Sequence, residues 1–426
     1  MKILTISNLY PPHYVGGYEL RCEAVVTALR ARGHVVEVLT SNHGVGTSRD
    51  GPAENGVSRA LRIHGFFGHP WLGISELREL ELHNNRILRQ AVAACQPDVV
   101  HVWNLGGISK SLCLTLQQLG VRVVYDISDH WIARSLVADV WLDWWNRPEP
   151  SFRVKLLRSF WTLTGARGRW SSIAPTNPVT DIRFARIYFC SRALLELTAA
   201  KGYQVGHGAV IYCPVNTLRF CGEPIPASRP LRKLLSVGRL AEDKGVFTAI
   251  KAMAAVQGKF AGELNIYGKG EASYTATLKA FVEQHRLPVR FHTASAADMP
   301  AVYRSHDALL FTSEWEEPFA LTPLEAMASG LPVIGTTTGG SRELFRSHEN
   351  SLTYKAGDSE ELALRILELN DDPARRARLA AAGHAEVRAR FAEPIIMDEI
   401  ENYLLQSVGD DSDRTGARPS PHRSRP

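Results

Sequence analysis

The chain has 426 residues, 45% of them hydrophobic, which is more than one hydrophobic core usually holds, so two domains are expected. Its 49 basic and 44 acidic side chains leave a formal net charge of +5, too balanced for nucleic acid to be the main partner. The six cysteines stand singly, which argues against a zinc site or a secreted disulfide scaffold and favours a reducing cytosol. Without a signal peptide or about 18 consecutive apolar residues, neither secretion nor a membrane span is expected.

The amino-terminal half predicts strands that alternate with helices. Short runs rich in Val and Ile occur at residues 3–7, 35–40, 99–102, 121–125 and 187–190. Such runs are typical of strands buried on both faces of a parallel sheet. A helix is expected over residues 18–32, where one stripe holds Leu20, Ala24, Ala28 and Leu29. Gly33 then supplies the left-handed residue that closes this helix.

Residues 141–170 differ in composition from the rest of this half. The segment combines Trp141, Trp144, Trp145, Trp161 and Trp170 with Arg147, Arg153, Lys155, Arg158, Arg167 and Arg169. One interpretation is an insertion whose aromatic rings pack on the amino-terminal domain. The other is contact with an anionic membrane or lipid surface.

The strand and helix pattern restarts after a Pro-rich stretch at residues 214–230, which we interpret as an interdomain linker. The second half offers strands at residues 234–237, 264–267, 289–292, 308–311 and 333–335. The expected fold is therefore α/β, with Rossmann-like doubly wound parallel-sheet domains at residues 1–213 and 231–392. A final helix is expected at residues 393–406, and the polar residues 407–426 predict a disordered tail.

The most informative segment is SEWEEPFALTPLEAMASGLPVIG, residues 313–335, which directly follows an expected strand. Pro323 suits the first position of a helix and Gly330 its carboxyl cap. The amides of Ala320, Leu321 and Thr322 would then lie unpaired at a helix amino terminus, where a diphosphate can bind. Glu317 and Glu325 flank that place, with Glu325 suited to a ribose diol and Glu317 nearer to a transferred sugar.

Glu317 and Glu325, with the Pro-Phe-Ala-Leu between them, resemble the paired-glutamate motif of family 4 retaining glycosyltransferases, also called group 1. The resemblance covers about residues 1–403 and implies the GT-B fold, in which two such domains face each other across a cleft. It implies that the first domain binds the acceptor, that the second binds a nucleoside diphosphate sugar, and that the last helix crosses back. The donor set then includes Phe319, Ala320, Leu321, Thr322 and Glu325. Ala320 departs from the family's usual glycine, and would cost about 1 kcal/mol if its φ were positive.

Two further segments resemble donor-binding parts of the same family. VGRLAEDKG, residues 237–245, gives Arg239 and Lys244 the role of neutralising the donor diphosphate. YPPHYVGGYE, residues 10–19, places Gly16 and Gly17 where bare backbone admits donor phosphates and acceptor. This loop lacks GxGxxG, which argues against an NAD-dependent enzyme. In YGKGE, residues 267–271, Gly268 and Gly270 are expected to shape the pocket for base or phosphate.

The segment DISDHW, residues 126–131, lies where the family commonly has a His-Asp pair near the reacting sugar. Ser128 occupies the usual His position. His130, Asp126 or Asp129 could supply the missing polar group, and Asp129 and His130 are carried as catalytic candidates with Glu317, Arg239 and Lys244. His101 either faces the expected cleft or is a satisfied core histidine.

The predicted function is retaining sugar transfer from a nucleoside diphosphate sugar to a glycan or lipid-linked acceptor, in bacterial cell-surface polysaccharide biosynthesis. Neither sheet offers a DxD motif or a His/Cys cluster, so no metal or other cofactor is expected. The expected location is the cytoplasm. If residues 141–170 contact anionic lipid, the protein is expected at the inner face of the cell membrane. The alternatives are a nucleotide-sugar epimerase, a sugar phosphorylase, or a non-catalytic sugar-nucleotide-binding protein.

Overall fold

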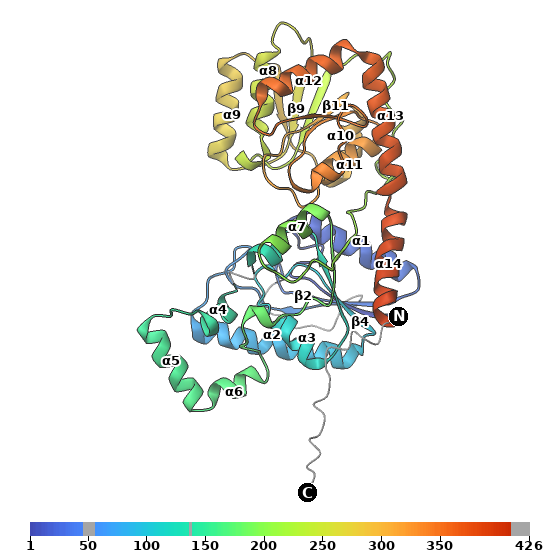
Figure 1. Ribbon diagram of the computed structural model, residues 1–426. Coiled ribbons are helices and arrows are strands. Elements are labelled where there is room, and N and C mark those ends of the chain that lie inside the picture. The colour runs from blue at the N-terminus through green and yellow to red at the C-terminus, as the bar shows by residue number, and fades with distance from the viewer. Residues whose placement is uncertain (46–55, 136–138, 410–426) are drawn as a thin grey trace. The chain divides into compact units, whose positions relative to one another are not determined.

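The computed structural model of the protein describes residues 1–45, 56–135 and 139–409. The chain divides into two compact units, each built on one parallel sheet (Figure 1). Unit 1 comprises Met1–Phe189, Leu195–Ile211 and the described chain from Met397 onward, and unit 2 comprises Cys190–Leu194 and Tyr212–Ile396. Within the described ranges, none of the helices is both long and apolar enough to cross a bilayer.

The sheet of unit 1 has the strand order β3-β2-β1-β4-β5-β6-β7, and all the pairings are parallel. Its strands are β1 (Lys2–Ile6), β2 (Val35–Ser41), β3 (Val57–Leu61), β4 (Val99–Val102), β5 (Val123–Ile127), β6 (Arg186–Phe189) and β7 (Ala209–Val210). The chain moves outward from β1 to β3 and then restarts at β4 on the other side of β1. The pair β1 and β4 is therefore the topological switch point of this sheet.

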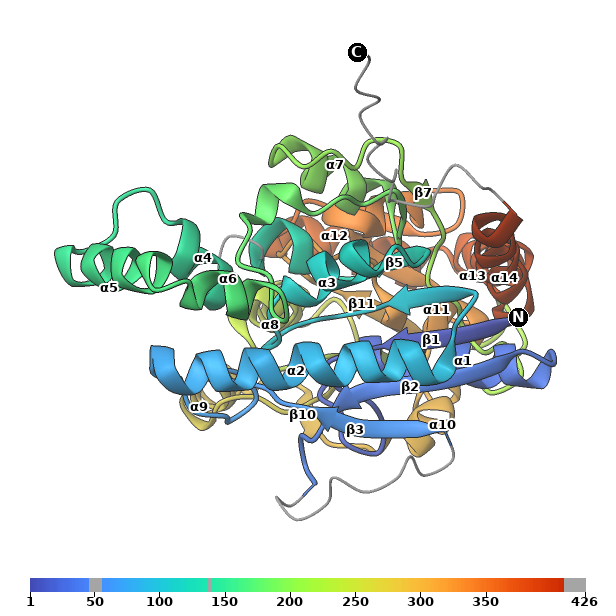
Figure 2. The ribbon, with the colours of Figure 1, turned by 90° about the horizontal axis from the view of Figure 1, so that it is seen from below.

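Helices cover both faces of the unit 1 sheet, with α2 and α3 on one face and α1 on the other (Figures 1 and 2). The helices are α1 (Gly17–Ala31), α2 (Ile74–Cys95), α3 (Ser111–Leu119), α4 (Val140–Asn146), α5 (Phe152–Leu163), α6 (Ala166–Ser171), α7 (Arg192–Ala200) and α14 (Glu393–Gly409), with short turns at Trp131–Ser135 and Val179–Asp181. Alpha-helices α5 and α6 form a hairpin that projects beyond the end of α2 (Figure 2).

The sheet of unit 2 has the order β10-β9-β8-β11-β12-β13 and is also fully parallel. Its strands are β8 (Lys233–Val237), β9 (Glu263–Tyr267), β10 (Val289–His292), β11 (Ala308–Phe311), β12 (Val333–Thr336) and β13 (Leu352–Tyr354). Its helices are α8 (Val246–Ala255), α9 (Ala272–Gln284), α10 (Met299–Arg304), α11 (Leu321–Ala328), α12 (Ser359–Asp371) and α13 (Pro373–Arg390), with short turns at Glu242–Lys244, Ala296–Asp298 and Gly339–Glu343. The switch point lies between β8 and β11.

The predicted strands are confirmed to within two residues, while β3, β7 and β13 were missed. The predicted stripe of α1 is partly wrong, because Leu20 is exposed and the buried apolar face is Cys22, Val25, Val26 and Leu29. Gly33 closes the helix with φ 87°, as expected.

The segments outside the two sheets differ in part from expectation. Residues 214–230, expected as a linker, pack within unit 2: Phe220 and Ile225 are buried, and the Ile225 amide donates to the Gly330 carbonyl. Helix α14 belongs to unit 1 from Met397 onward, where the Tyr403 hydroxyl donates to the Ile187 carbonyl at 2.9 Å. Residues 407–409 of the expected tail are helical, with Ser407 buried, and residues 410–426 lie outside the described chain.

Candidate active site

Two of the predicted site residues of unit 2, Arg239 and Lys244, line a hollow at the carboxyl ends of β8 and β11. The hollow is lined by residues that follow both strands, among them Gly238, Arg239, Lys244, Thr312 and Ser313. In open parallel sheets the two chains leaving a switch point diverge, and this opens a crevice for a ligand. Arg239 and Lys244, predicted to act together on a diphosphate, therefore line one hollow.

Lys244 is held by the segment that follows β11. Its Nζ forms an ion pair with Glu317 Oε1, and Ser313 Oγ donates to the same oxygen at 2.7 Å. Thr312 Oγ1 donates to the Lys244 carbonyl at 2.8 Å, which fixes the backbone at this point. The ammonium and the first glutamate of the predicted motif are thus direct partners.

Arg239 is much freer to move than Lys244. Its side chain is 68% exposed, and its guanidinium donates to Asp243 at 3.3 Å. An exposed pair of this kind contributes little to stability and is easily exchanged for another anion. The guanidinium can therefore turn from Asp243 to a bound phosphate at small cost.

Two glycines, Gly268 and Gly245, let neighbouring loops around this hollow approach each other closely. A Cβ at Gly268 would lie 1.8 Å from the Gly238 carbonyl oxygen, and the Gly238 amide donates to the Tyr267 carbonyl. Gly245, next to Lys244, has φ 60°, and a Cβ there would lie 2.0 Å from the Thr312 carbonyl oxygen. Both positions therefore require glycine in order to keep the two loops in register.

Helix α11 begins at Leu321 with Ala320 as its amino-terminal cap. Ala320 has φ −83°, so alanine is unstrained where the family usually has glycine. Pro323 was expected at the first position of the helix, but it is the third residue of α11. Gly330 lies just past the helix with φ 81°, in the conformation predicted for the carboxyl end.

Glu325 lies in α11 and is bound by Tyr303, whose hydroxyl donates to Glu325 Oε2 at 2.7 Å. Burial raises the pKa of the Glu325 carboxyl to about 7, against the opposing effects of Tyr303 and Arg219. Glu325 is not among the residues that line the hollow at β8 and β11. The structure thus brings Arg239, Lys244 and Glu317 together, and places Glu325 further along α11.

In unit 1 the glycine pair forms the start of α1. Gly16 is the amino-terminal cap with φ −145°, and its amide donates to Glu19 Oε2 at 2.9 Å. Burial raises the pKa of Glu19. The glycines follow β1, so they lie at the switch point of this sheet.

Asp126 is committed to a buried ion pair. Arg21 Nη1 donates to both carboxylate oxygens at 2.9 and 2.8 Å, and both side chains are almost fully buried. Arg21 also donates to Ser128 Oγ, which in turn donates to Asp126 Oδ1 at 2.6 Å. Ser128, at the usual His position, is thereby part of a structural network, and Asp126 is unsuited to a catalytic role.

Asp129 and His130 remain as the polar candidates of this loop. Asp129 accepts from Asn104 Nδ2 at 2.8 Å and from the Trp131 amide at 2.7 Å, and burial raises its pKa to about 6. His130 is only 7% exposed. His101 is a core residue: its Nε2 lies 2.9 Å from the Tyr188 hydroxyl, and burial lowers its pKa to about 4.

Replacing Arg21 by alanine is expected to lower the free energy of unfolding of unit 1 by about 3–5 kcal/mol, because Asp126 would stay buried without its partner. Denaturant titration followed by tryptophan fluorescence measures this, since every tryptophan except Trp315 lies in unit 1. Arg147→Ala is the control, because that residue forms an exposed pair with Asp143 and should leave the midpoint unchanged. Equal midpoints for both variants would contradict the structural role of Arg21.

Sequence reasoning missed several residues that hold the candidate side chains, namely Arg21, Asn104, Tyr303 and Ser313. Arg21 carried the one available signal, since it lies on the helical face that also holds Cys22 and Val25. An arginine on a buried face requires an acidic partner.

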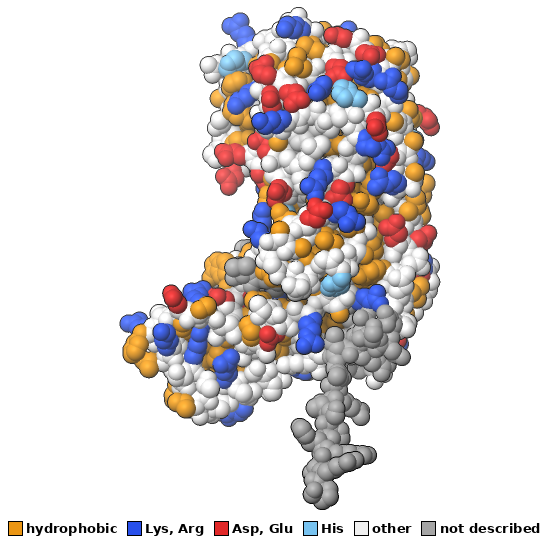
Figure 3. Space-filling view, viewed as in Figure 1, with side chains coloured by type: hydrophobic (Ala, Val, Ile, Leu, Met, Phe, Trp, Pro, Cys, Tyr) orange, Lys and Arg blue, Asp and Glu red, His pale blue; other side chains and the backbone are white. Residues whose placement is uncertain are grey.

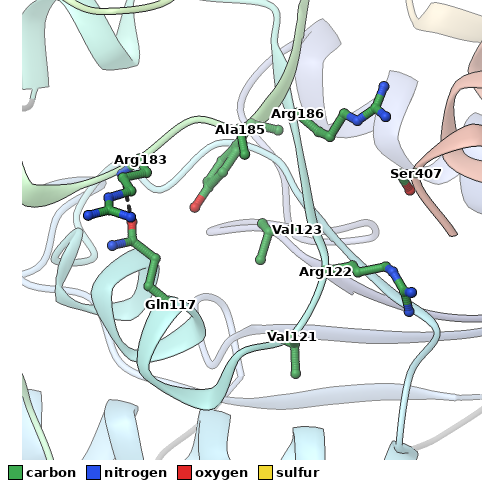
Figure 4. Close-up of a pocket in the computed structure, with 9 residues that line it drawn as sticks. Gln117, Val121, Arg122, Val123, Arg183, Ala185, Arg186 and Ser407 are labelled. Carbon is green, nitrogen blue, oxygen red and sulfur yellow. Dashed lines mark hydrogen bonds between the residues drawn. The ribbon is translucent and has the colours of Figure 1, made fainter. Parts of the chain in front are cut away.

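A second hollow lies in unit 1, at the amino-terminal ends of strands β5 and β6. It is lined by the chain entering β5 and β6, including Arg122, Arg183 and Arg186, and by Ser407 of α14 (Figure 4). The Arg183 amide donates to Gln117 there. In open parallel sheets, ligands bind beyond the carboxyl ends of the strands at the switch point. This hollow lies at the amino-terminal ends, so it is not where a ligand is expected.

Both halves of the chain match family models. Residues 225–386 match the model of glycosyl transferases group 1, and residues 16–170 match a glycosyl transferase 4-like domain. The chain belongs to the group 1 glycosyltransferases. Arg239, Lys244, Glu317 and Glu325 of this glycosyltransferase lie in the first match, and Gly16, Gly17, Asp129 and His130 in the second.

The relatives of this glycosyltransferase are named for different transfer reactions. It is 25% identical over 434 residues to the glycogen synthase of Mycobacterium tuberculosis, with 92% of this chain and 91% of that protein covered. It is 30% identical to a lipopolysaccharide core biosynthesis glycosyltransferase of Rhizobium meliloti, with 41% and 49% covered. It is 33% identical to a GDP-mannose-dependent monoacylated alpha-(1-6)-phosphatidylinositol monomannoside mannosyltransferase of Corynebacterium glutamicum, with 39% and 45% covered.

Solved structures show the same fold. HepE of Anabaena, crystallised with UDP-glucose, superimposes with a TM-score of 0.66 at 19% identity, covering 95% of this chain and 100% of that one. Sucrose-phosphate synthase of Thermosynechococcus elongatus gives a TM-score of 0.68 at 19% identity, covering 95% and 98%. The glycosyltransferase therefore has the GT-B fold, as predicted.

Proposed function

We propose that this glycosyltransferase transfers a sugar from a nucleoside diphosphate sugar with retention of anomeric configuration. The observation that carries the proposal is the hollow at the ends of β8 and β11, where Arg239 and Lys244 present two cations at a switch point. HepE, which shares the fold, was crystallised with UDP and UDP-glucose.

In the proposed reaction, bond cleavage moves negative charge onto the diphosphate. Lys244 and Arg239 stabilise that charge more strongly in the transition state than in the ground state, and this difference lowers the barrier. The acceptor oxygen attacks the face from which the diphosphate leaves, and a diphosphate oxygen takes its proton. Glu317 keeps the Lys244 ammonium in place, and Asp129 and His130 are the unit 1 groups assigned to the reacting sugar.

We further propose that no metal is required, because the two side-chain cations and the α11 amides of Leu321 and Thr322 can neutralise the leaving group. Turnover is expected to be unchanged after dialysis against a chelator. Complete loss of turnover in chelator, followed by recovery with Mg²⁺ or Mn²⁺, would show that a metal is needed.

Glu325 is proposed to accept hydrogen bonds from the donor ribose. Since its pKa is raised to about 7, the carboxyl is largely protonated at pH 6 and ionised at pH 8. Ionisation strengthens an acceptor, so the dissociation constant of the donor should fall by up to about tenfold across this range. Calorimetric titration of the sugar nucleotide at both pH values measures this, and Glu325→Gln should abolish the dependence. A wild-type constant independent of pH would remove the assignment.

The proposed place of action is bacterial cell-surface glycan assembly at the inner face of the membrane. This rests on the lipopolysaccharide and phosphatidylinositol mannoside enzymes among its relatives.

The test is a panel of nucleoside diphosphate sugars read by release of the nucleoside diphosphate. At least one donor should give release above background. Incubation with donor alone separates an epimerase, which would convert the sugar without release. Addition of inorganic phosphate separates a phosphorylase, which would form a sugar phosphate. Either of those products without acceptor-dependent transfer would overturn the proposal.

A further inference from the structure

Helix α5 exposes an apolar stripe. Phe152, Leu156, Phe160 and Leu163 are 74, 55, 59 and 88% exposed. Their spacing of i, i+4, i+8 and i+11 places them on one side of the helix. Figure 3 shows hydrophobic and basic side chains together over this projecting end. Single exposed apolar residues are common, but a continuous stripe along a helix marks a surface that something covers.

The opposite side of α5 contacts neighbouring aromatic rings through Trp161 and Arg158, although none of its residues is fully buried. The Trp161 ring lies 5.2 Å from Trp144 and 5.0 Å from Trp170. Arg158 lies over the Trp144 ring at 5.4 Å, and Arg78 of α2 lies over Trp170 at 5.0 Å. The tryptophans therefore form the inner contact of the hairpin, in agreement with the first interpretation of the insertion, and leave the outer stripe facing solvent.

Basic residues border the stripe on both sides. Arg153 and Lys155 are exposed, and their positions place one at each edge of the stripe formed by Phe152, Leu156 and Phe160. Helix α5 contains no acidic residue at all. Long basic side chains at the rim of an apolar face can reach phosphates while their stems cover apolar surface.

We propose that α5 docks in the plane of a membrane that contains anionic phospholipids. The four apolar side chains would enter the boundary between headgroups and acyl chains, and Arg153 and Lys155 would meet lipid phosphates. A helix of 12 residues is about 18 Å long, too short for a hydrocarbon core of about 30 Å, so it lies along the surface. The proposal deepens the membrane location proposed above and rests on it only for the choice of leaflet.

Charge favours a membrane over a second copy of this chain. A symmetric dimer through the stripe would bring two sets of Arg153 and Lys155 together, with no carboxylate on α5 to compensate them. An anionic lipid surface satisfies both the apolar stripe and its rim of cations.

Sedimentation with phosphatidylcholine vesicles, with and without about one quarter phosphatidylglycerol, tests the proposal. The wild-type protein should bind the anionic vesicles at least about tenfold more strongly than the neutral ones. Both Leu156→Ser/Phe160→Ser and Arg153→Gln/Lys155→Gln should lower binding to anionic vesicles by about tenfold or more. The control Leu364→Ser removes a leucine of α12 that is 64% exposed, against 55% for Leu156, and should bind like wild type.

Wild-type protein that stays in the supernatant, or a Leu156→Ser/Phe160→Ser variant that binds like wild type, would overturn the proposal. So would a wild-type dimer in sedimentation velocity that this variant loses, since the stripe would then join two copies. Donor turnover by the same variants keeps the two proposals separate, because α5 carries none of the assigned site residues. Loss of vesicle binding with turnover intact supports docking, and absent turnover in the wild type would count against the proposed chemistry alone.

Discussion

Replacing Lys244 by alanine is expected to lower turnover by about 100-fold or more, the usual effect of removing one group that stabilises developing negative charge. Lys244 lines the hollow at β8 and β11 and is held there by Glu317 and by the contact of Thr312 with its carbonyl. Its ammonium is therefore preorganised before a ligand arrives. Turnover is measured as nucleoside diphosphate release at saturating donor.

Two comparisons make the Lys244 result interpretable. Lys259→Ala removes the same charge from unit 2 at an exposed residue beyond α8, and should leave turnover unchanged. Because Lys244→Ala leaves Glu317 without its ammonium partner, the thermal midpoint must be compared as well, and Lys244→Ala/Glu317→Gln relieves the unpaired charge. A folded Lys244→Ala variant with turnover near that of wild type would exclude Lys244 from the chemistry.

Replacing Gly245 by alanine should also lower turnover by about 100-fold, through the backbone and not through charge. The added Cβ would lie 2.0 Å from the Thr312 carbonyl oxygen, so the loop that carries Lys244 must move away from β11. A displacement of about 1 Å at a reacting group is enough for such a loss.

Gly258→Ala provides a matched control for Gly245. Gly258 has φ 80°, close to the 60° of Gly245, but a Cβ there meets no atom within 4 Å. In both variants the left-handed backbone therefore costs about 1 kcal/mol of stability. Only Gly245→Ala adds a collision with the Thr312 carbonyl oxygen. Equal turnover in the two variants would show that the approach of the Lys244 loop to Thr312 does not matter.

The strands that could be predicted are the interior strands of both sheets, whose runs are mostly apolar and buried, and the edge strand β10. The strands β3, β7 and β13 were missed, and each is at the edge of its sheet. Edge strands are short or partly polar because one side has no neighbour, so β3 reads Val-Ser-Arg-Ala-Leu and β7 has only two residues. In the two described sheets, composition thus marked every interior strand but only one of the four edge strands, β10.

The motifs pointed to two residues of unit 2 that line one hollow, but not to the contacts that arrange the candidate side chains. Arg239 and Lys244, chosen from the segment 237–245, line the same hollow because both follow the central strand β8. Their partners could not be predicted: Ser313 and Tyr303 reach Glu317 and Glu325 through tertiary packing, which leaves no local pattern. Whether alanine is strained at position 320 could likewise be decided only from the backbone conformation. The φ of Ala320 is −83°, so no glycine is required there.

The unit 1 loop illustrates the same limit. On sequence alone, Asp126, Asp129 or His130 could supply the missing polar group, and Asp129 and His130 were carried as catalytic candidates. The partner of Asp126 is Arg21, more than a hundred residues away, and this contact alone separates a structural carboxylate from its neighbours.

The proposed binding of a diphosphate by Lys244 and Arg239 is tested most directly by calorimetric titration. Nucleoside diphosphates are compared with the matching monophosphates. At least one diphosphate should bind about tenfold or more tightly than its monophosphate, because the additional phosphate meets Lys244 and Arg239. Lys244→Ala should remove most of that difference. Equal affinities for mono- and diphosphates of every base, or a difference that survives in Lys244→Ala, would contradict the assignment of the hollow between β8 and β11.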